Sequence, residues 1–186
     1  MKAINNFKNV QATTGEFNRP SANGYIIEII GVKDVPLDEA TQKGDYLKID
    51  YDIAVGEFKG YYTEQNEKFG GDWFASFIRS YKEKALGMFK HFTNCVEDSN
   101  VGYTWNWDEK SLVGKLVGVV MQEEKYTKKD GSIGTSLKVK DIKTVEQIRK
   151  GDFKIPPVKK VEQSASTSNA TNTQWEELSS DDSLPF

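Results

Sequence analysis

Aromatic and lysine side chains alternate closely in two parts of this sequence. A ring can stack on a nucleobase for about 1–3 kcal/mol whatever the base, and a lysine can neutralise a phosphate and release its counterions. The two residue types together are what the binding of a single-stranded nucleic acid requires. The predicted contacts are Tyr46, Lys48, Phe58, Lys59, Tyr61, Tyr62, Lys125, Tyr126, Lys128 and Lys129.

Each of these residues also has an ordinary structural interpretation. Phe58 and one of Tyr61 and Tyr62 would then belong to the hydrophobic core, and the lysines would form a solvated surface. A single alternating strand cannot bury both of two adjacent tyrosines, because successive side chains point to opposite faces. We therefore expect part of the set to face a ligand.

A second aromatic group has a strict spacing. Tyr103, Trp105 and Trp107 recur at every second residue, so they share one face of an extended segment. They could form a stacking platform. Because tryptophan is usually largely buried, the favoured interpretation is that they close one end of the fold.

Residues that could support catalysis form weaker patterns. Asp50 and Asp52 share one face of a predicted strand, and Glu123, Glu124 and Lys125 form an acid-x-Lys pattern, so a magnesium-dependent nuclease is the alternative from the enzyme class. Such outward acid pairs are more often only solvated.

The remaining chemistry-bearing residues do not complete a catalytic site. His91 and Cys95 are four apart on a predicted helix, but nothing supplies a third catalytic group. The sequence has one histidine and one cysteine, and it contains no Walker A or Gly-x-Gly-x-x-Gly motif. We predict no enzymatic activity, no cofactor and no metal site.

The last six residues are the most specific feature of the sequence. Asp181, Asp182, Ser183, Leu184, Pro185 and Phe186 follow a polar segment rich in serine, threonine and asparagine. In such a tip, the phenylalanine can insert into an apolar pocket of another protein while the acidic side chains meet a basic rim. The alternative to partner binding is that this acidic end only keeps the protein soluble.

This ending resembles the acidic tip of bacterial single-stranded-DNA-binding proteins, which also carry a flexible linker between barrel and tip. The barrel part departs from the family's usual opening strands and is more similar to divergent members from bacteriophages and mobile elements. The resemblance implies that the chain binds and protects single-stranded DNA without sequence specificity during replication or recombination. It also implies recruitment of replication, recombination and repair proteins through Asp181, Asp182, Leu184, Pro185 and Phe186. A protein-binding adaptor that keeps the tip is the second alternative, and a homo-oligomer stays open.

The elements that must position these residues can be read from hydrophobic periodicity. Strands are predicted over 25–32, 46–55 and 57–62, helices from an N-cap at Asp72 to about Val96, and a hairpin of strands 113–124 and 136–142 around Asp130-Gly131. Three strands, a helical insertion and a two-stranded hairpin are the order of a mainly β, five-stranded OB-fold barrel.

Composition sets the domain organisation. With 186 residues of which 37% are hydrophobic, the chain can bury one core. We predict an OB-fold domain over 1–158, a disordered linker over 159–177 and the acidic tip over 178–186. Residues 1–160 hold 25 basic and 23 acidic groups, and residues 161–186 hold five acidic and no basic ones. The sequence shows no signal sequence and no long apolar run. We therefore predict a cytoplasmic protein that does not bind membranes and that acts in a bacterial cell or a phage-infected host.

Overall fold

A five-stranded antiparallel sheet is the main element of the computed structural model, which describes residues 18–128 and 130–159. Its strands lie in the order β3-β2-β1-β4-β5. Their bounds are β1 Gly24–Val35, β2 Tyr46–Ile53, β3 Ser76–Ser80, β4 Leu116–Thr127 and β5 Ile133–Lys143. The prediction of a mainly β protein is confirmed.

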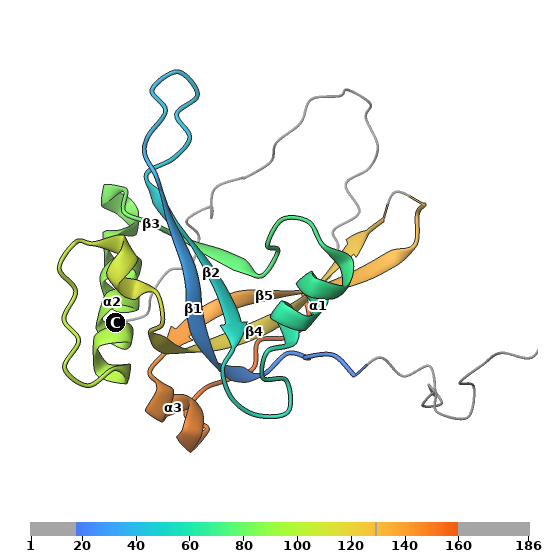
Figure 1. The fold of residues 1–186 in the computed structure, drawn as a ribbon. Helices are drawn as coiled ribbons and strands as arrows, with labels where there is room; N and C mark the ends of the chain where they lie inside the picture. Colours follow the sequence, from blue (N-terminus) through green and yellow to red (C-terminus); the bar gives the residue numbers. More distant parts are fainter. Residues whose placement is uncertain (1–17, 129, 160–186) are drawn as a thin grey trace, which may run out of the picture.

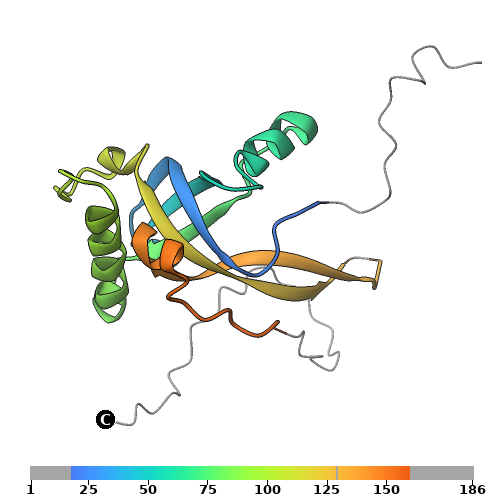
Figure 2. The same cartoon turned by 90° about the horizontal axis from the view of Figure 1, so that it is seen from below.

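Within residues 18–128 and 130–159, three α-helices and two short 3-10 helices surround the sheet. They are α1 Tyr61–Phe69, η2 Glu83–Ala85, α2 Leu86–Ser99, η3 Glu109–Leu112 and α3 Val145–Lys150. Figures 1 and 2 both show α1 on the side of the sheet to which the β4–β5 hairpin extends, with α2 at the opposite side. Helix α2 contacts β3, β4 and β5, and α3 packs on β4 and β1.

The core lies between the curved sheet and α2. Alternate residues of β2 point inward, as the sequence predicts: Leu47, Ile49, Tyr51 and Ile53 are all buried. They meet the inward residues of β1 and β4 and one face of α2, which contribute Ile27, Ile29, Val117, Val119, Met121, Phe92 and Val96. Burial of an aliphatic or aromatic side chain contributes about 1.5–3 kcal/mol each, so this layer supplies most of the driving force for folding.

The sheet is not closed. Strands β3 and β5 stand at its two edges, and no ladder joins them in the described part of the chain. Instead, α2 contacts both edge strands and covers one end of the gap between them.

The predicted third strand over residues 57–62 is wrong. Gly56 and Gly60 adopt φ values of 92° and 76°, which break any extended conformation there, and α1 begins at Tyr61. Left-handed φ values are favourable for glycine and costly for most other residues. The two glycines therefore mark a loop that leads into a helix.

The predicted helix that starts at Asp72 is also wrong. Residues 76–80 form β3 and pair with β2, with Phe77 opposite Ile49 and Ile78 opposite Lys48. Helix α1 ends before Gly70 and Gly71, which both have positive φ. An available edge on β2 outweighs the near-helical spacing of the aromatic residues, and the helix forms later, at Leu86.

Several predicted features lie outside the described residues. They are Lys129, the tip over 178–186 and the linker over 159–177 except for Lys159. Lys159 bridges Glu124 of β4 in parallel orientation. Among the described residues, no helix is long and apolar enough to cross a membrane.

Candidate nucleic-acid interface

A cleft of about 440 Å³ opens between the two edges of the sheet, where α1 faces the β4–β5 hairpin. A cavity of this size lies within the range of ligand pockets in proteins. One wall comes from α1 and the start of β3, and the other from β4 and β5. The cleft is lined by Arg19, Pro20, Tyr51, Tyr61, Tyr62, Phe74, Ala75, Ser76, Glu123, Tyr126, Thr135, Ser136, Leu137 and Lys138.

Asp52 fixes the first wall. Its buried carboxylate accepts hydrogen bonds from the backbone N–H groups of Tyr62 (3.0 Å) and Thr63 (2.9 Å) and from the Thr63 hydroxyl (2.5 Å). These N–H groups belong to the first turn of α1. No carbonyl group within a helix can accept hydrogen bonds from the N–H groups of its first turn. A carboxylate there also meets the positive end of the helix dipole. The helix start is thereby tied to the end of β2.

Aromatic rings hold the same wall through edge-to-face contacts. The ring of Tyr62 is 5.3 Å from that of Tyr61 and 5.7 Å from that of Phe74, at interplanar angles of 82° and 78°. Phe58 supports Tyr61 from behind at 6.2 Å. Such T-shaped pairs are a favoured arrangement of aromatic rings. Phe74 stays 59% exposed, so the series ends in a ring that is open to solvent.

The second wall presents one ring and one cation. Tyr126 on β4 pairs with Gly134 on β5, and a Cβ atom at Gly134 would lie 2.6 Å from the ring carbon Cζ of Tyr126. The glycine therefore makes the room in which this ring lies across the neighbouring strand. The ring is 46% exposed, and Lys138 of β5 lines the cleft beside it.

The charges of the cleft favour an anion. Arg19 and Lys138 line it with one acidic residue, Glu123. Burial raises the pKa of Tyr62 to about 12 and raises that of Tyr51 as well, so both phenols stay neutral at physiological pH. The aromatic wall thus adds no negative charge that would repel phosphates.

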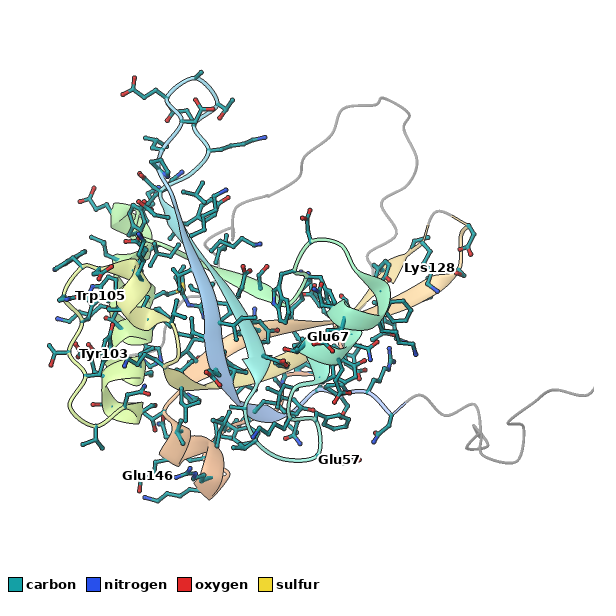
Figure 3. All side chains as sticks on the ribbon, in the orientation of Figure 1. Glu57, Glu67, Tyr103, Trp105, Lys128 and Glu146 are labelled. Carbon is teal, nitrogen blue, oxygen red and sulfur yellow. The ribbon has the colours of Figure 1, made fainter. Side chains whose placement is uncertain are left out.

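The structure brings three of the predicted contact residues to the cleft. Tyr61 and Tyr126 are partly or well exposed there, and Tyr62 is buried, with 6% of its surface exposed. Lys125 and Lys128 are exposed on the same hairpin, and Figure 3 shows Lys128 at its outer end.

The other predicted contacts lie elsewhere. Phe58 packs against the core behind Tyr61, and Lys59 is exposed in the loop before α1. Tyr46 and Lys48 point away from the core on β2, where Lys48 contacts Asp50 at 3.1 Å. They form a separate outer face of the sheet.

Sequence reasoning missed several residues of the cleft. Phe74 lies in the segment that was predicted as a helix, and Arg19 precedes the first predicted strand. Thr135, Ser136 and Lys138 belong to a predicted hairpin, but no periodicity could indicate that β5 faces α1. The proximity depends on the curvature of the whole sheet.

The aromatic residues at 103–107 lie at the far side of the molecule from the cleft. Figure 3 shows Tyr103 and Trp105 beside α2, opposite Lys128. Both are partly buried and pack against the core, as favoured from the sequence, whereas Trp107 is 77% exposed.

The residues of the nuclease alternative do not converge. Asp52 is engaged with α1, and Asp50 contacts Lys48 on the outer face of β2. The described ranges contain no cluster of three or more histidine, cysteine or acidic residues that could hold a metal ion. His91 lies 3.6 Å from the Cys95 sulfur, but burial raises the pKa of that thiol to about 11, which leaves it protonated and unreactive.

Comparison with known proteins found no protein-family model that matches this sequence and no curated protein with a matching sequence.

Proposed function

We propose that the protein binds single-stranded DNA without sequence specificity, that the cleft between α1 and the β4–β5 hairpin is its main contact, and that it catalyses no reaction. The observation that carries this proposal is the placement of exposed rings on both walls of one cleft, together with two cations. Tyr61 and Phe74 come from one wall and Tyr126 from the other.

Stacking on such rings favours single strands. The faces of bases in a duplex are already covered by neighbouring base pairs, whereas an unpaired base can lie against a ring of either wall. The contacts are tolerant of sequence because every base has an aromatic face. Arg19 and Lys138 then meet the phosphates of the bound segment, which adds affinity that falls with salt.

The arrangement of strands supports an OB-type barrel whose seam is the cleft. Strand β1 pairs with both β2 and β4, and α2 follows β3 and contacts β3, β4 and β5. An OB barrel is itself partly open and binds oligonucleotides on its surface. The proposed binding site lies where β3 and β5 approach each other without pairing.

Partner recruitment is the second part of the proposal and concerns the tip, Asp181, Asp182, Leu184, Pro185 and Phe186, which lies outside the described residues. The Phe186→Ala protein should fail to capture replication and repair proteins that bind acidic peptides, and it should bind oligo-dT like the parent. A Ser183→Ala protein is the matched control in the same tip. Capture of the same partners at parental levels by Phe186→Ala protein would show that the tip has no recruiting role.

The binding proposal is tested by titrating the protein with oligo-dT and with a duplex of equal length. Oligo-dT should quench the intrinsic fluorescence of the tyrosines and tryptophans and bind more tightly than the duplex. Equal affinity for both would remove stacking as the basis of recognition.

A further inference from the structure

Trp107 is the most exposed tryptophan of the described residues and has an unusual backbone conformation. It is 77% exposed, and its φ of 67° lies in the left-handed region. That region is rare for a bulky residue that is neither glycine nor asparagine, and such strain is concentrated at functional sites. Burial does not account for a tryptophan at this position.

Other rings hold the Trp107 side chain in place. It stacks on Phe89 of α2 with ring centroids 6.5 Å apart and an interplanar angle of 26°, and Trp105 lies 6.1 Å away. The Phe89 ring is itself buried. One face of Trp107 is thus supported by the fold while most of the residue stays accessible. This is the arrangement of a preorganised stacking surface.

Strand β3 connects this surface with the cleft. Ser76 at its start lines the cleft, and Tyr81, directly after its end, has its ring 6.0 Å from that of Phe89. At about 3.3 Å per residue, the five residues of β3 span only roughly 13 Å. Strand β3 therefore spans part of the distance between the two aromatic sites, with its outer face beside that of β2.

Two lysines of adjacent strands face each other on this outer face. Lys33 of β1 and Lys48 of β2 are directly opposite each other in the antiparallel ladder, and Lys48 is opposite the exposed Ile78 of β3. Like charges at directly opposed positions destabilise a sheet. Lys48 also contacts Asp50 at 3.1 Å, so Lys33 is the cation of this pair that a phosphate would meet. Lys82 follows at the end of β3, and it is exposed.

We infer that Trp107 is a second stacking contact for the same DNA strand, which leaves the cleft, crosses the outer face of β2 and β3 past Lys33 and Lys48, and reaches Trp107. This inference rests on the proposed function. It also assigns a role to Tyr46 and Lys48, which lie outside the cleft. A strand too short to extend beyond the cleft makes no contact with Trp107.

The inference is tested with oligo-dT of about 4 and about 16 nucleotides, the limits of the site sizes known for OB folds. The Trp107→Ala protein should bind the longer strand about 5-fold to about 150-fold more weakly, the effect of one lost stacked base, and should bind the shorter strand like the parent. The Trp107→Phe protein should retain most of the affinity. Val101→Ala, in the same loop and fully exposed, is the matched control.

The outcomes separate this inference from the proposed function. If the parent binds neither strand, the proposed function fails and the inference with it. If the parent binds both strands and Trp107→Ala leaves the longer one unaffected, or weakens both equally, only the second contact is overturned. A Trp107→Asn protein guards against misfolding, because asparagine tolerates the left-handed conformation, and it should show the same selective loss.

Discussion

The carboxylate of Asp52 determines where two adjacent tyrosines point. By accepting hydrogen bonds from the first turn of α1, it sets the rotation of the helix about its axis, so that Tyr62 enters the core and Tyr61 faces the cleft. The sequence predicts that Tyr61 and Tyr62 cannot both be buried, and the structure confirms this. The physical basis differs, since neighbours on a helix, unlike those on a strand, diverge by about 100°.

The two tyrosines should respond differently to substitution. Tyr61→Ala should lower the free energy of unfolding less than Tyr62→Ala does, because Tyr61 is only partly buried, and should weaken oligo-dT binding by about 1–3 kcal/mol. Tyr62→Ala should lower the free energy of unfolding by about 3–5 kcal/mol, as for other large aromatic residues removed from a core. Urea unfolding and oligo-dT titration measure the two effects. A Tyr61→Ala protein with parental affinity would exclude Tyr61 from the interface.

At the scale of single elements, two glycines differ in the room that their surroundings leave for a side chain. A Cβ atom at Gly118 of β4 would lie 2.7 Å from the carbonyl oxygen of Thr144 and 2.5 Å from a side-chain carbon of Ile148 in α3. The Gly118→Ala protein should therefore lose about 1–3 kcal/mol of stability through overpacking. At Gly87 of α2, a Cβ atom would meet nothing within 4 Å.

Gly87→Ala is thus the matched control, and it should stabilise the protein by about 0.5–1 kcal/mol, because alanine loses less backbone entropy in a helix. Thermal unfolding of both variants tests the packing of α3 on β4. Equal stability of the two proteins would contradict the described contact between these elements.

The elements differ in how well the sequence predicts them. The alternation of Leu47, Ile49 and Tyr51 predicts β2, since one face of that strand is fully covered. The turn at Asp130-Gly131 likewise predicts the β4–β5 hairpin from local chemistry. Strand β3 is not predictable in this way. Its five residues are extended because they pair with β2, and pairing with a strand that is distant in sequence leaves no local pattern.

Over the whole molecule, the cleft depends on the curvature of a five-stranded sheet that stays open between β3 and β5. The cleft joins Arg19, the start of β3 and the hairpin, which are distant in the sequence, so the sequence predicted three of its tyrosines and neither of its cations. Which rings are exposed depends on α1, whose first two residues, Tyr61 and Tyr62, the sequence pattern assigned to a strand. Trp105, whose ring lies 6.1 Å from that of Trp107, is at the opposite side of the molecule from Lys128 of the hairpin (Figure 3).

The central claim, that a single DNA strand binds in the cleft, is tested most directly by the salt dependence of oligo-dT affinity in two matched double variants. Arg19→Ala with Lys138→Ala removes both cations of the cleft, and Arg149→Ala with Lys150→Ala removes the same charge from exposed positions on α3. Each phosphate contact contributes about 0.7 to the slope of log affinity against log salt for single strands. The cleft variant should therefore have a slope flatter by about 1.4 and weaker binding, and the α3 variant should match the parent. Equal slopes in the two variants, or a parent protein that does not bind oligo-dT, would contradict binding of a single strand in this cleft.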